Sequence, residues 1–317
     1  MILHAAAVIF GSLVVLILGS WMHHQVRMIR EIRTASASPY SHTVSVNGRR
    51  VTVYIEGEGK ETLVFMAGAG TSAPVLDFKP LWTRLTGRFR TAVLERSGYG
   101  FSGIAPGIPR DINSLLEEAR LSLQEAQIHP PYILVPHSMS ALIALYWARM
   151  FPHEVKAVIG LDPAIPETYD HLPMPPVFVL RMISLLGVLG ITRWVPAMVQ
   201  SPVLREGSLS EKEQEICIGL AHRRMFTVNM IDEIRYAAVN SQTVLKEGVP
   251  KDTPMLFFIS DGKEVKTERW RELLMKYINQ AEQGRYQLVS SGHYIHHHEP
   301  QYLAQEITDY VDSLPKS

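Results

Sequence analysis

The fold is decided by the stretch Tyr132-Ile-Leu-Val-Pro-His-Ser138-Met-Ser-Ala-Leu-Ile-Ala-Leu-Tyr-Trp-Ala-Arg149. A short apolar run ends at Pro136, the polar Ser138 follows, and apolar residues then recur at helical spacing from Leu142. This pattern predicts a strand, a sharp turn and a helix. The middle residue of such a turn is exposed at the top of a sheet, a position that suits a nucleophile. Ser138 is therefore the candidate nucleophile.

The turn departs from the usual G-x-S-x-G pattern, because Pro136 and Ser140 stand where glycines are common. Small residues are favoured at both places, since the neighbouring strand and helix come close. Ser140 is small, and Pro136 can end a strand and stiffen the turn through its fixed φ. The alternative interpretation is a serine that merely opens a helix.

Length and composition limit the classes of function. The 317 residues, 46% of them hydrophobic, suffice for one large core and one or two domains. The 31 basic and 31 acidic residues cancel and form no long run, which argues against a nucleic-acid-binding surface. The single cysteine, Cys217, excludes an internal disulfide framework, fits a reducing compartment, and is expected to fill the core.

The N-terminal residues predict a membrane anchor. Residues 2–22 contain no Asp, Glu, Lys or Arg, and as a helix they would span roughly 30 Å, about one hydrocarbon core. We assign residues 1–24 to a transmembrane anchor and 25–42 to a juxtamembrane linker. Three arginines that follow the apolar run, Arg27, Arg30 and Arg33, place the rest of this single-pass protein in the cytoplasm. A buried hydrophobic helix is the alternative.

After the linker, strand and helix patterns alternate. A hairpin with an Asn-Gly turn comes first and is followed by a buried strand. The alternation of strands and helices predicts a mostly parallel sheet with helices on both faces. Ligands of such sheets lie at the carboxyl ends of the strands, where Gly68, Ser138 and Asp162 fall. Strands are expected at 43–47, 51–55, 63–67, 91–94, 132–136, 155–161, 255–259 and 286–289, and helices at 114–127, 267–282 and 299–314.

The alternation stops between residues 164 and 250, so we assign residues 43–163 and 251–317 to the core and 164–250 to a helical insertion. Helices are expected at 211–225 and 229–246. An apolar run at 177–191 carries Arg181 and two glycines. These features favour a lid over an apolar pocket, leaning on the membrane, rather than a second membrane span.

A glycine-rich loop, residues 68–72, follows the buried strand at 63–67. A phosphate loop would need a following lysine, and a dinucleotide site would need G-x-G-x-x-G at the start of a helix; neither is present. An oxyanion hole fits better, with the backbone N–H groups of Ala69 and Met139 as donors. No cofactor is expected.

The segment after the last strand supplies a candidate general base, His293. A histidine at this point can lie over the sheet beside the nucleophile; a solvated loop histidine is the alternative. His296, His297 and His298 suggest a metal, but three adjacent residues cannot all face one ion. We interpret them as the approach to the last helix and expect no metal.

Taken in order, these motifs resemble the α/β-hydrolase superfamily over about residues 43–314. The resemblance implies a serine hydrolase fold with a catalytic triad and a lid. A serine at position 138 argues against the haloalkane dehalogenase and epoxide hydrolase members, whose covalent ester needs a carboxylate. The matching segments are Ala67-Gly68-Ala69-Gly70 for H-G-x-G, Glu95-Arg-Ser-Gly-Tyr-Gly-Phe-Ser102 for D-R-x-G-x-G-x-S, Pro136-His-Ser-Met-Ser140 for G-H-S-M-G, and Gly292-His-Tyr-Ile-His-His-His-Glu-Pro300 for G-H-x-x-H-x-E-x-P.

The acid of the triad is left open between two aspartates. In most members of this superfamily the acid follows the strand that here ends at Ile259, where Asp261 stands and Lys263 occupies the commonest position. In a minority it follows the strand after the elbow helix, where Asp162 stands. Asp162 is slightly favoured, and either aspartate could instead cap a turn.

The expected function is that of a membrane-anchored serine hydrolase that cleaves a small or medium apolar ester through an acyl-enzyme. Its partners would be that ester and a lipid bilayer, contacted through residues 2–22, with no nucleic acid. Amide, C–C or thioester cleavage uses the same residues. The alternative is a catalytically silent, membrane-anchored binding or scaffold protein with the same fold.

Overall fold

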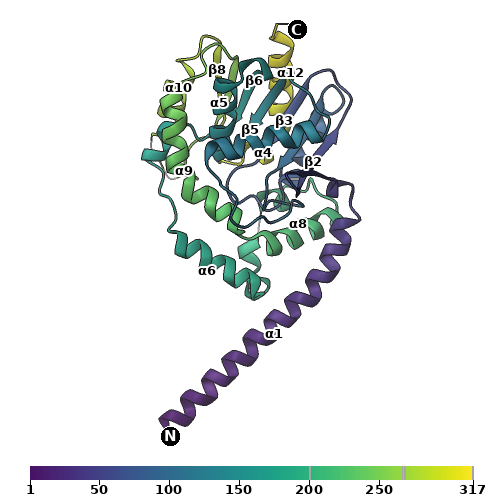
Figure 1. The fold of residues 1–317 in the computed structure, drawn as a ribbon, viewed down its shortest axis with the longest axis vertical. Coiled ribbons are helices and arrows are strands. Elements are labelled where there is room, and N and C mark those ends of the chain that lie inside the picture. The colour runs from purple at the N-terminus through teal and green to yellow at the C-terminus, as the bar shows by residue number, and fades with distance from the viewer. Residues whose placement is uncertain (200, 266, 268, 316–317) are drawn as a thin grey trace.

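The computed structural model describes residues 1–199, 201–265, 267 and 269–315. Its centre is an eight-stranded sheet in the order β1-β2-β4-β3-β5-β6-β7-β8 (Figure 1). The first two strands run antiparallel to their neighbours, and the pairs from β4 to β8 are parallel. The strands are β1 (Thr43–Val46), β2 (Arg49–Glu56), β3 (Thr62–Met66), β4 (Arg90–Glu95), β5 (Tyr132–Pro136), β6 (Val155–Leu161), β7 (Met255–Ile259) and β8 (Gly284–Leu288).

The predicted hairpin and alternation are confirmed. Asn47 and Gly48 join β1 to β2 with φ angles of +49° and +76°, as a two-residue hairpin turn requires. The interior strands β3, β5 and β7 are buried along their whole length, which explains their continuous apolar runs. At the edge of the sheet, β8 is largely exposed. It begins two residues before the predicted strand and ends one residue before it.

Helices cover both faces of the sheet. One hydrophobic cluster joins α3 and α12 to one face, and a second joins α4, α5 and α10 to the other. Asp111 caps α4 by accepting hydrogen bonds from the N–H groups of Asn113 and Ser114, as its sequence position predicts. The helices of the core are α2 (Pro74–Asp77), α3 (Lys79–Leu85), α4 (Ile112–Glu125), η2 (Ser138–Ser140), α5 (Ala141–Met150), η3 (Pro152–Glu154), α10 (Trp270–Ile278), α11 (Ile295–His298) and α12 (Pro300–Ser313).

One core helix differs in length from the prediction. The helix expected at 267–282 is the shorter α10, and residues 266 and 268 lie outside the described part of the chain. The last helix, expected at 299–314, is confirmed as α12, and the short α11 precedes it, separated by Glu299, which leaves the helical conformation before Pro300.

Between β6 and β7 lies a helical segment, called the insertion below (residues 164–250). It comprises η4 (Pro166–Asp170), α6 (Val177–Val188), η5 (Ile191–Trp194), η6 (Pro196–Val199), α7 (Pro202–Arg205), α8 (Glu211–Arg224) and α9 (Val228–Glu247). The two helices expected at 211–225 and 229–246 are therefore confirmed. Helix α9 packs against the core, whereas α6 lies at the margin of the body (Figure 1).

A buried ion network fixes α9 to the core. Glu233 of α9 accepts from Arg96, which follows β4, and from Arg110, and Arg110 also pairs with Glu118 of α4. All four side chains are at most 2% exposed. Tyr99 adds a hydrogen bond of 2.7 Å to Glu233. Because these charges have lost their hydration, each depends on its partners.

The N-terminal helix α1 (Ile2–Ser36) is longer than the predicted anchor (Figure 1). It is the one helix in the described residues that is long and apolar enough to cross a membrane, and its most apolar 18-residue window is 0% buried. The expected linker is helical as far as Ser36 because this part of α1 packs against α8. A short turn, η1 (Pro39–Ser41), leads into β1.

One carboxylate joins α1, the core and the insertion. Glu213, in the first turn of α8, accepts from Tyr40 after α1 and from Lys79 of α3. Glu213 also closes a capping box with Ser210. Burial by itself would raise the pKa of Glu213, but the hydrogen bonds from Lys79, Tyr40 and Ser210 outweigh it and lower that pKa to about 2.

We expect Glu233→Gln to lower the free energy of unfolding by about 3 to 5 kcal/mol, because it removes one charge from a buried pair and leaves two arginines short of a counter-ion. Asp232→Asn is the matched control, since its partner Arg235 is 52% exposed and such a pair contributes about 0 to 1 kcal/mol. Denaturant unfolding in detergent measures both. Equal losses of unfolding free energy in the two variants would contradict the importance of the network.

We expect acid to weaken the wild-type protein more than Glu213→Gln. A carboxylate whose folded pKa is lowered contributes stability that is complete above its unfolded pKa, about 4.5, and is lost as pH falls towards about 2. Thermal unfolding midpoints measured at several pH values between 5 and 3 test this. Parallel curves for the two proteins would show that Glu213 is not the group responsible.

Candidate active site

The predicted elbow is present at the end of β5. Ser138 has a φ of +53°, a left-handed conformation that is strained for a residue with a side chain. Ser140 is buried, and its hydroxyl donates to the Met66 carbonyl at the end of β3 over 2.6 Å. A Cβ built on Gly68 would lie 2.9 Å from the Ser138 Cβ. Gly68 is therefore required where the glycine-rich loop passes Ser138.

The structure also explains Pro136. Pairing between β5 and β6 runs as far as Leu134 opposite Val158 and resumes only as an isolated bridge at His137. Pro136 lies in this gap in the ladder, so its missing N–H removes no hydrogen bond to β6. On the other side, the next amide, of His137, donates to Met66 over 2.9 Å.

Asp162 and His293 form the central polar contact of the site. The Nδ1 atom of His293 lies 2.6 Å from Oδ2 of Asp162, whose side chain is 0% exposed. The other carboxylate oxygen accepts from the Ser260 amide and from the indole N–H of Trp270, each over 2.8 Å. Asp162 itself has a φ of +45°. Because Nδ1 is bound to Asp162, the Nε2 atom is the free acid–base position of this imidazole.

Asp261 lies apart from this contact. Its carboxylate accepts from the Lys263 backbone over 3.0 Å and pairs with the Lys263 ammonium over 2.9 Å. The hydrogen bonds from Lys263 lower the pKa of Asp261. Of the two candidate aspartates, only Asp162 is thus brought to His293.

Three residues that sequence reasoning did not single out hold His293 in place. The ring of His137 donates to the His293 carbonyl over 3.1 Å, and the two ring centroids are 4.7 Å apart. Glu264 accepts from the His293 amide over 2.7 Å. Trp270 contacts both Asp162 and the His293 ring. His137 adjoins Ser138 in the sequence, but no local pattern marks Glu264 or Trp270.

The glycine-rich loop lies under the insertion. Ala69 packs beside a small apolar cluster formed by Leu180 of α6 and by Ile231 and Ile234 of α9. Arg96 of the buried network donates to the Ala67 carbonyl over 3.0 Å, which fixes the start of the loop. Met139, the second expected oxyanion donor, directly follows Ser138 and is half-buried. The loop and the elbow therefore meet at the carboxyl edge of the sheet.

The segment after β4 is held by Glu95, which replaces the aspartate of related motifs. Its two oxygens accept from the amides of Val75 and Phe101, over 3.2 and 2.6 Å. A Cβ on Gly100 would lie about 2.1 Å from this carboxylate, so only glycine fits there. Burial raises the pKa of Glu95 to about 7.

A cavity of about 240 Å³ separates the core from the insertion. Its core wall includes Gly70 and Thr71 of the glycine-rich loop and Tyr294, the residue after His293. Its other wall comes from the insertion and includes Met198, Val203, Cys217 and Phe226. Cys217 is buried, as expected, and burial raises the pKa of its thiol to about 12, so the thiol stays protonated at neutral pH.

The three adjacent histidines lead into the last helix, as expected, and two of them share one acidic partner. The Nε2 atoms of His296 and His297 both reach the buried carboxylate of Asp77, at 3.0 and 3.2 Å, while His298 is exposed. Two neighbouring histidines can face one point because α11 is a single short turn. Burial lowers the pKa of His296 to about 4, which keeps it neutral. The Asp77 carboxylate therefore accepts from the Nε2 atoms of both rings.

Comparisons with known proteins agree with this geometry. Residues 61–210 match the model of a family described as the alpha/beta hydrolase fold. The uncharacterized protein YbdG of Bacillus subtilis (strain 168) is 34% identical over 256 residues, which cover 78% of this chain and 78% of YbdG. The chain belongs to the α/β-hydrolase fold family.

Solved structures of this α/β-hydrolase type extend the comparison. The CarC serine hydrolase of carbazole degradation is 14% identical with a TM-score of 0.58, covering 86% of this chain and 98% of CarC. Epoxide hydrolase A from Mycobacterium thermoresistibile is 17% identical with a TM-score of 0.63, covering 87% of this chain and 99% of its own. At such identities the likeness concerns the fold alone. The fold hosts both chemistries, so the reaction must be argued from the residues.

Proposed function

We propose that this protein is a serine hydrolase that cleaves an apolar carboxylic ester through an acyl-enzyme. The observation that carries the proposal is the 2.6 Å contact between Asp162 and His293 at the sheet edge where Ser138 occupies a strained elbow. A buried carboxylate on Nδ1 of an imidazole is the arrangement that orients a general base and stabilises its charged form. Ser138 is then the nucleophile, His293 the base and Asp162 the acid.

The proposed reaction has two halves. Nε2 of His293 takes the proton from the Ser138 hydroxyl as its oxygen attacks the ester carbonyl carbon, and the carbonyl oxygen becomes an oxyanion. The N–H groups of Ala69 and Met139 would stabilise that oxyanion, and losing one such donor costs about 3 to 4 kcal/mol. The alcohol leaves with the proton from His293. Water then attacks the acyl-enzyme by the same steps and releases the acid.

The cavity adjoins the proposed site, since it is lined by the neighbours Gly70 and Tyr294 rather than by Ser138 and His293, and it supports a small or medium apolar acyl group. Its 240 Å³ lies below the usual range for drug-sized ligands, about 300 to 1,000 Å³. Its insertion wall carries the apolar side chains of Met198, Val203 and Phe226. In this proposal residues 164–250 act as the lid over a core formed by residues 43–163 and 251–317.

We also propose that α1 anchors the protein in a membrane as a single span over residues 2–22. The exposed apolar segment of α1, which is long enough to cross a bilayer, supports an anchor. The exposed Arg27, Arg30 and Arg33 support a cytoplasmic position for the rest of the chain.

Ser138→Ala is expected to abolish covalent labelling by a fluorophosphonate probe, because the probe reacts only with an activated serine hydroxyl. Ser140→Ala is the matched control, since its buried hydroxyl is bound to backbone carbonyls. Gel fluorescence of the detergent-solubilised protein measures the labelling. Absence of labelling in a folded wild type would favour a binding protein over an enzyme.

Asp162→Asn is expected to lower kcat by roughly 10⁴-fold, because the amide favours the wrong tautomer of the His293 ring. Asp261→Asn should leave turnover close to the wild-type value, as Asp261 contacts Lys263 rather than His293. Hydrolysis of a short-chain p-nitrophenyl ester measures both variants. If Asp261→Asn caused the larger loss, the assignment of the acid would be reversed.

A further inference from the structure

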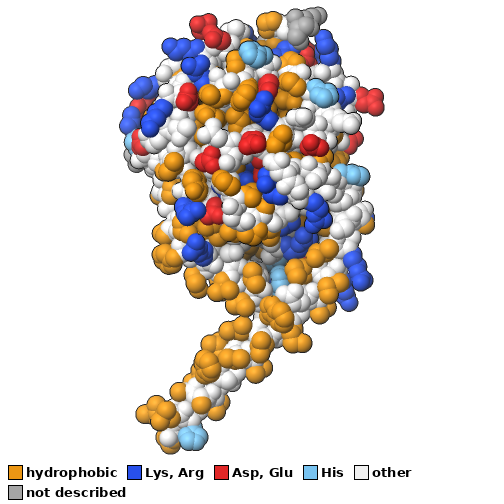
Figure 2. Space-filling view, viewed as in Figure 1, with side chains coloured by type: hydrophobic (Ala, Val, Ile, Leu, Met, Phe, Trp, Pro, Cys, Tyr) orange, Lys and Arg blue, Asp and Glu red, His pale blue; other side chains and the backbone are white. Residues whose placement is uncertain are grey.

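Helix α6 of the insertion carries an apolar face that the described residues leave largely exposed. Its side chains Phe178, Met182, Leu185 and Val188 are 69%, 52%, 46% and 57% exposed. The following turn adds Trp194, which is 63% exposed, and Val195. These six residues are called the α6 face below. Figure 2 shows hydrophobic side chains gathered on this lower margin of the body and along the free length of α1. Exposed apolar patches of this kind mark a surface that is covered in use.

The α6 face is tied to α1 at one level of that helix. The Trp194 indole donates to the Ser20 hydroxyl over 3.0 Å, and its ring lies 5.3 Å from that of His23. Ser20 in turn donates to the Leu189 carbonyl over 3.0 Å. About three helical turns further along α1 than Ser20, Arg193 makes a bidentate pair with Glu31, with both distances 2.7 Å. These contacts therefore hold the α6 face at a fixed position along the axis of α1.

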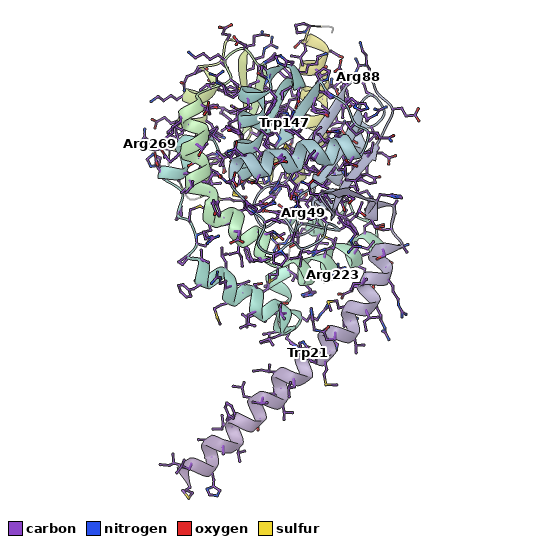
Figure 3. The ribbon with its side chains drawn as sticks, viewed as in Figure 1. Trp21, Arg49, Arg88, Trp147, Arg223 and Arg269 are labelled. Carbon is purple, nitrogen blue, oxygen red and sulfur yellow. The ribbon has the colours of Figure 1, made fainter. Side chains whose placement is uncertain are left out.

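The position along α1 at which the α6 face is attached coincides with the end of the exposed apolar segment of α1. Residues 2–19 of α1 precede Ser20, the first buried residue of the helix. Eighteen residues rise roughly 27 Å, close to the thickness of a hydrocarbon core. Trp21 lies where α1 leaves the body (Figure 3). If residues 2–19 cross a bilayer, the membrane–water interface falls at Ser20 and Trp21. Trp194 beside them then lies at the depth where membrane proteins are enriched in tryptophan.

The composition of α6 fits an interface helix. Twelve residues rise roughly 18 Å, too short for a span. Arg181 is the one charged residue of α6 and is exposed, so its long side chain can reach lipid phosphates while its neighbours enter the acyl layer. The exposed Arg27 and Arg30 on α1 would lie at the same headgroup level.

We infer that the α6 face is a second membrane contact, embedded in the headgroup and acyl boundary of the same bilayer that α1 spans. The inference rests on the anchor in the proposed function. It does not depend on the chemistry at Ser138. The occupant of the face is lipid, not a second protein.

Fluorescent labels in the full-length protein test this contact. In a Cys217→Ala background, an environment-sensitive label is placed at Phe178→Cys, and at Leu13→Cys of α1 as the report on the anchor. Val239→Cys is the matched control, because Val239 is 60% exposed and apolar but lies on α9. The three positions are exposed, so the substitutions do not disturb the core. Proteoliposomes are prepared with and without nitroxide-labelled phosphatidylcholine, which quenches labels inside the bilayer.

We expect most of the fluorescence at positions 13 and 178 to be lost with the nitroxide lipid, and that at position 239 to be retained. Quenching at 13 but not at 178 would overturn the second contact and leave the anchor in place. Quenching at neither position would overturn the anchor and the contact together. Equal quenching at 178 and 239 would indicate general adsorption and would also overturn the inference.

Discussion

The buried network of Arg96, Glu233, Arg110 and Glu118 is the interaction on which the arrangement of the site depends. It joins the loop after β4, the residue before the cap of α4, helix α4 itself and the insertion helix α9 in one desolvated cluster. Each charge is costly to bury and becomes tolerable only when the others are in position, so the cluster specifies one placement of α9. Arg96 also holds the carbonyl of Ala67. The same cluster thus fixes the glycine-rich loop and the helix above it.

A second constraint comes from the parallel sheet. Its strands end at one edge, so residues separated by more than a hundred positions in the chain meet there, as Asp162 and His293 do. The site is then completed by contacts that do not depend on strand order. Trp270 and the Ser260 amide saturate one oxygen of Asp162 and leave the other for His293. The positive φ angles of Ser138 and Asp162 are tolerated because these surroundings over-determine both residues.

Local physics made much of the fold predictable from the sequence. The Asn47-Gly48 turn and the elbow at Ser138 each depend on a few adjacent residues, and both were predicted in place. The partner of His293 could not be chosen in this way, because Asp162 and Asp261 both follow buried strands and differ only in long-range contacts. The contact of His296 and His297 with Asp77 was not predicted either, because a one-turn helix directs two adjacent rings to a carboxylate that is distant in the sequence. The helical part of the expected linker was missed because its stability comes from packing against α8, which no local pattern records.

The contact between Glu31 and Arg193 gives α1 a role in the packing of the globular body. Gly219 of α8 lies against Glu31 so closely that a Cβ on that glycine would be 3.1 Å from the Glu31 side chain. Removing residues 1–36 to obtain a water-soluble protein would therefore strip a buried carboxylate from Arg193, whose side chain is 6% exposed, and open a groove along α8. A shortened chain that begins after Trp21 but keeps Glu31 would retain this pair. The boundary suited to solubility and the boundary suited to folding lie at different residues of the same helix.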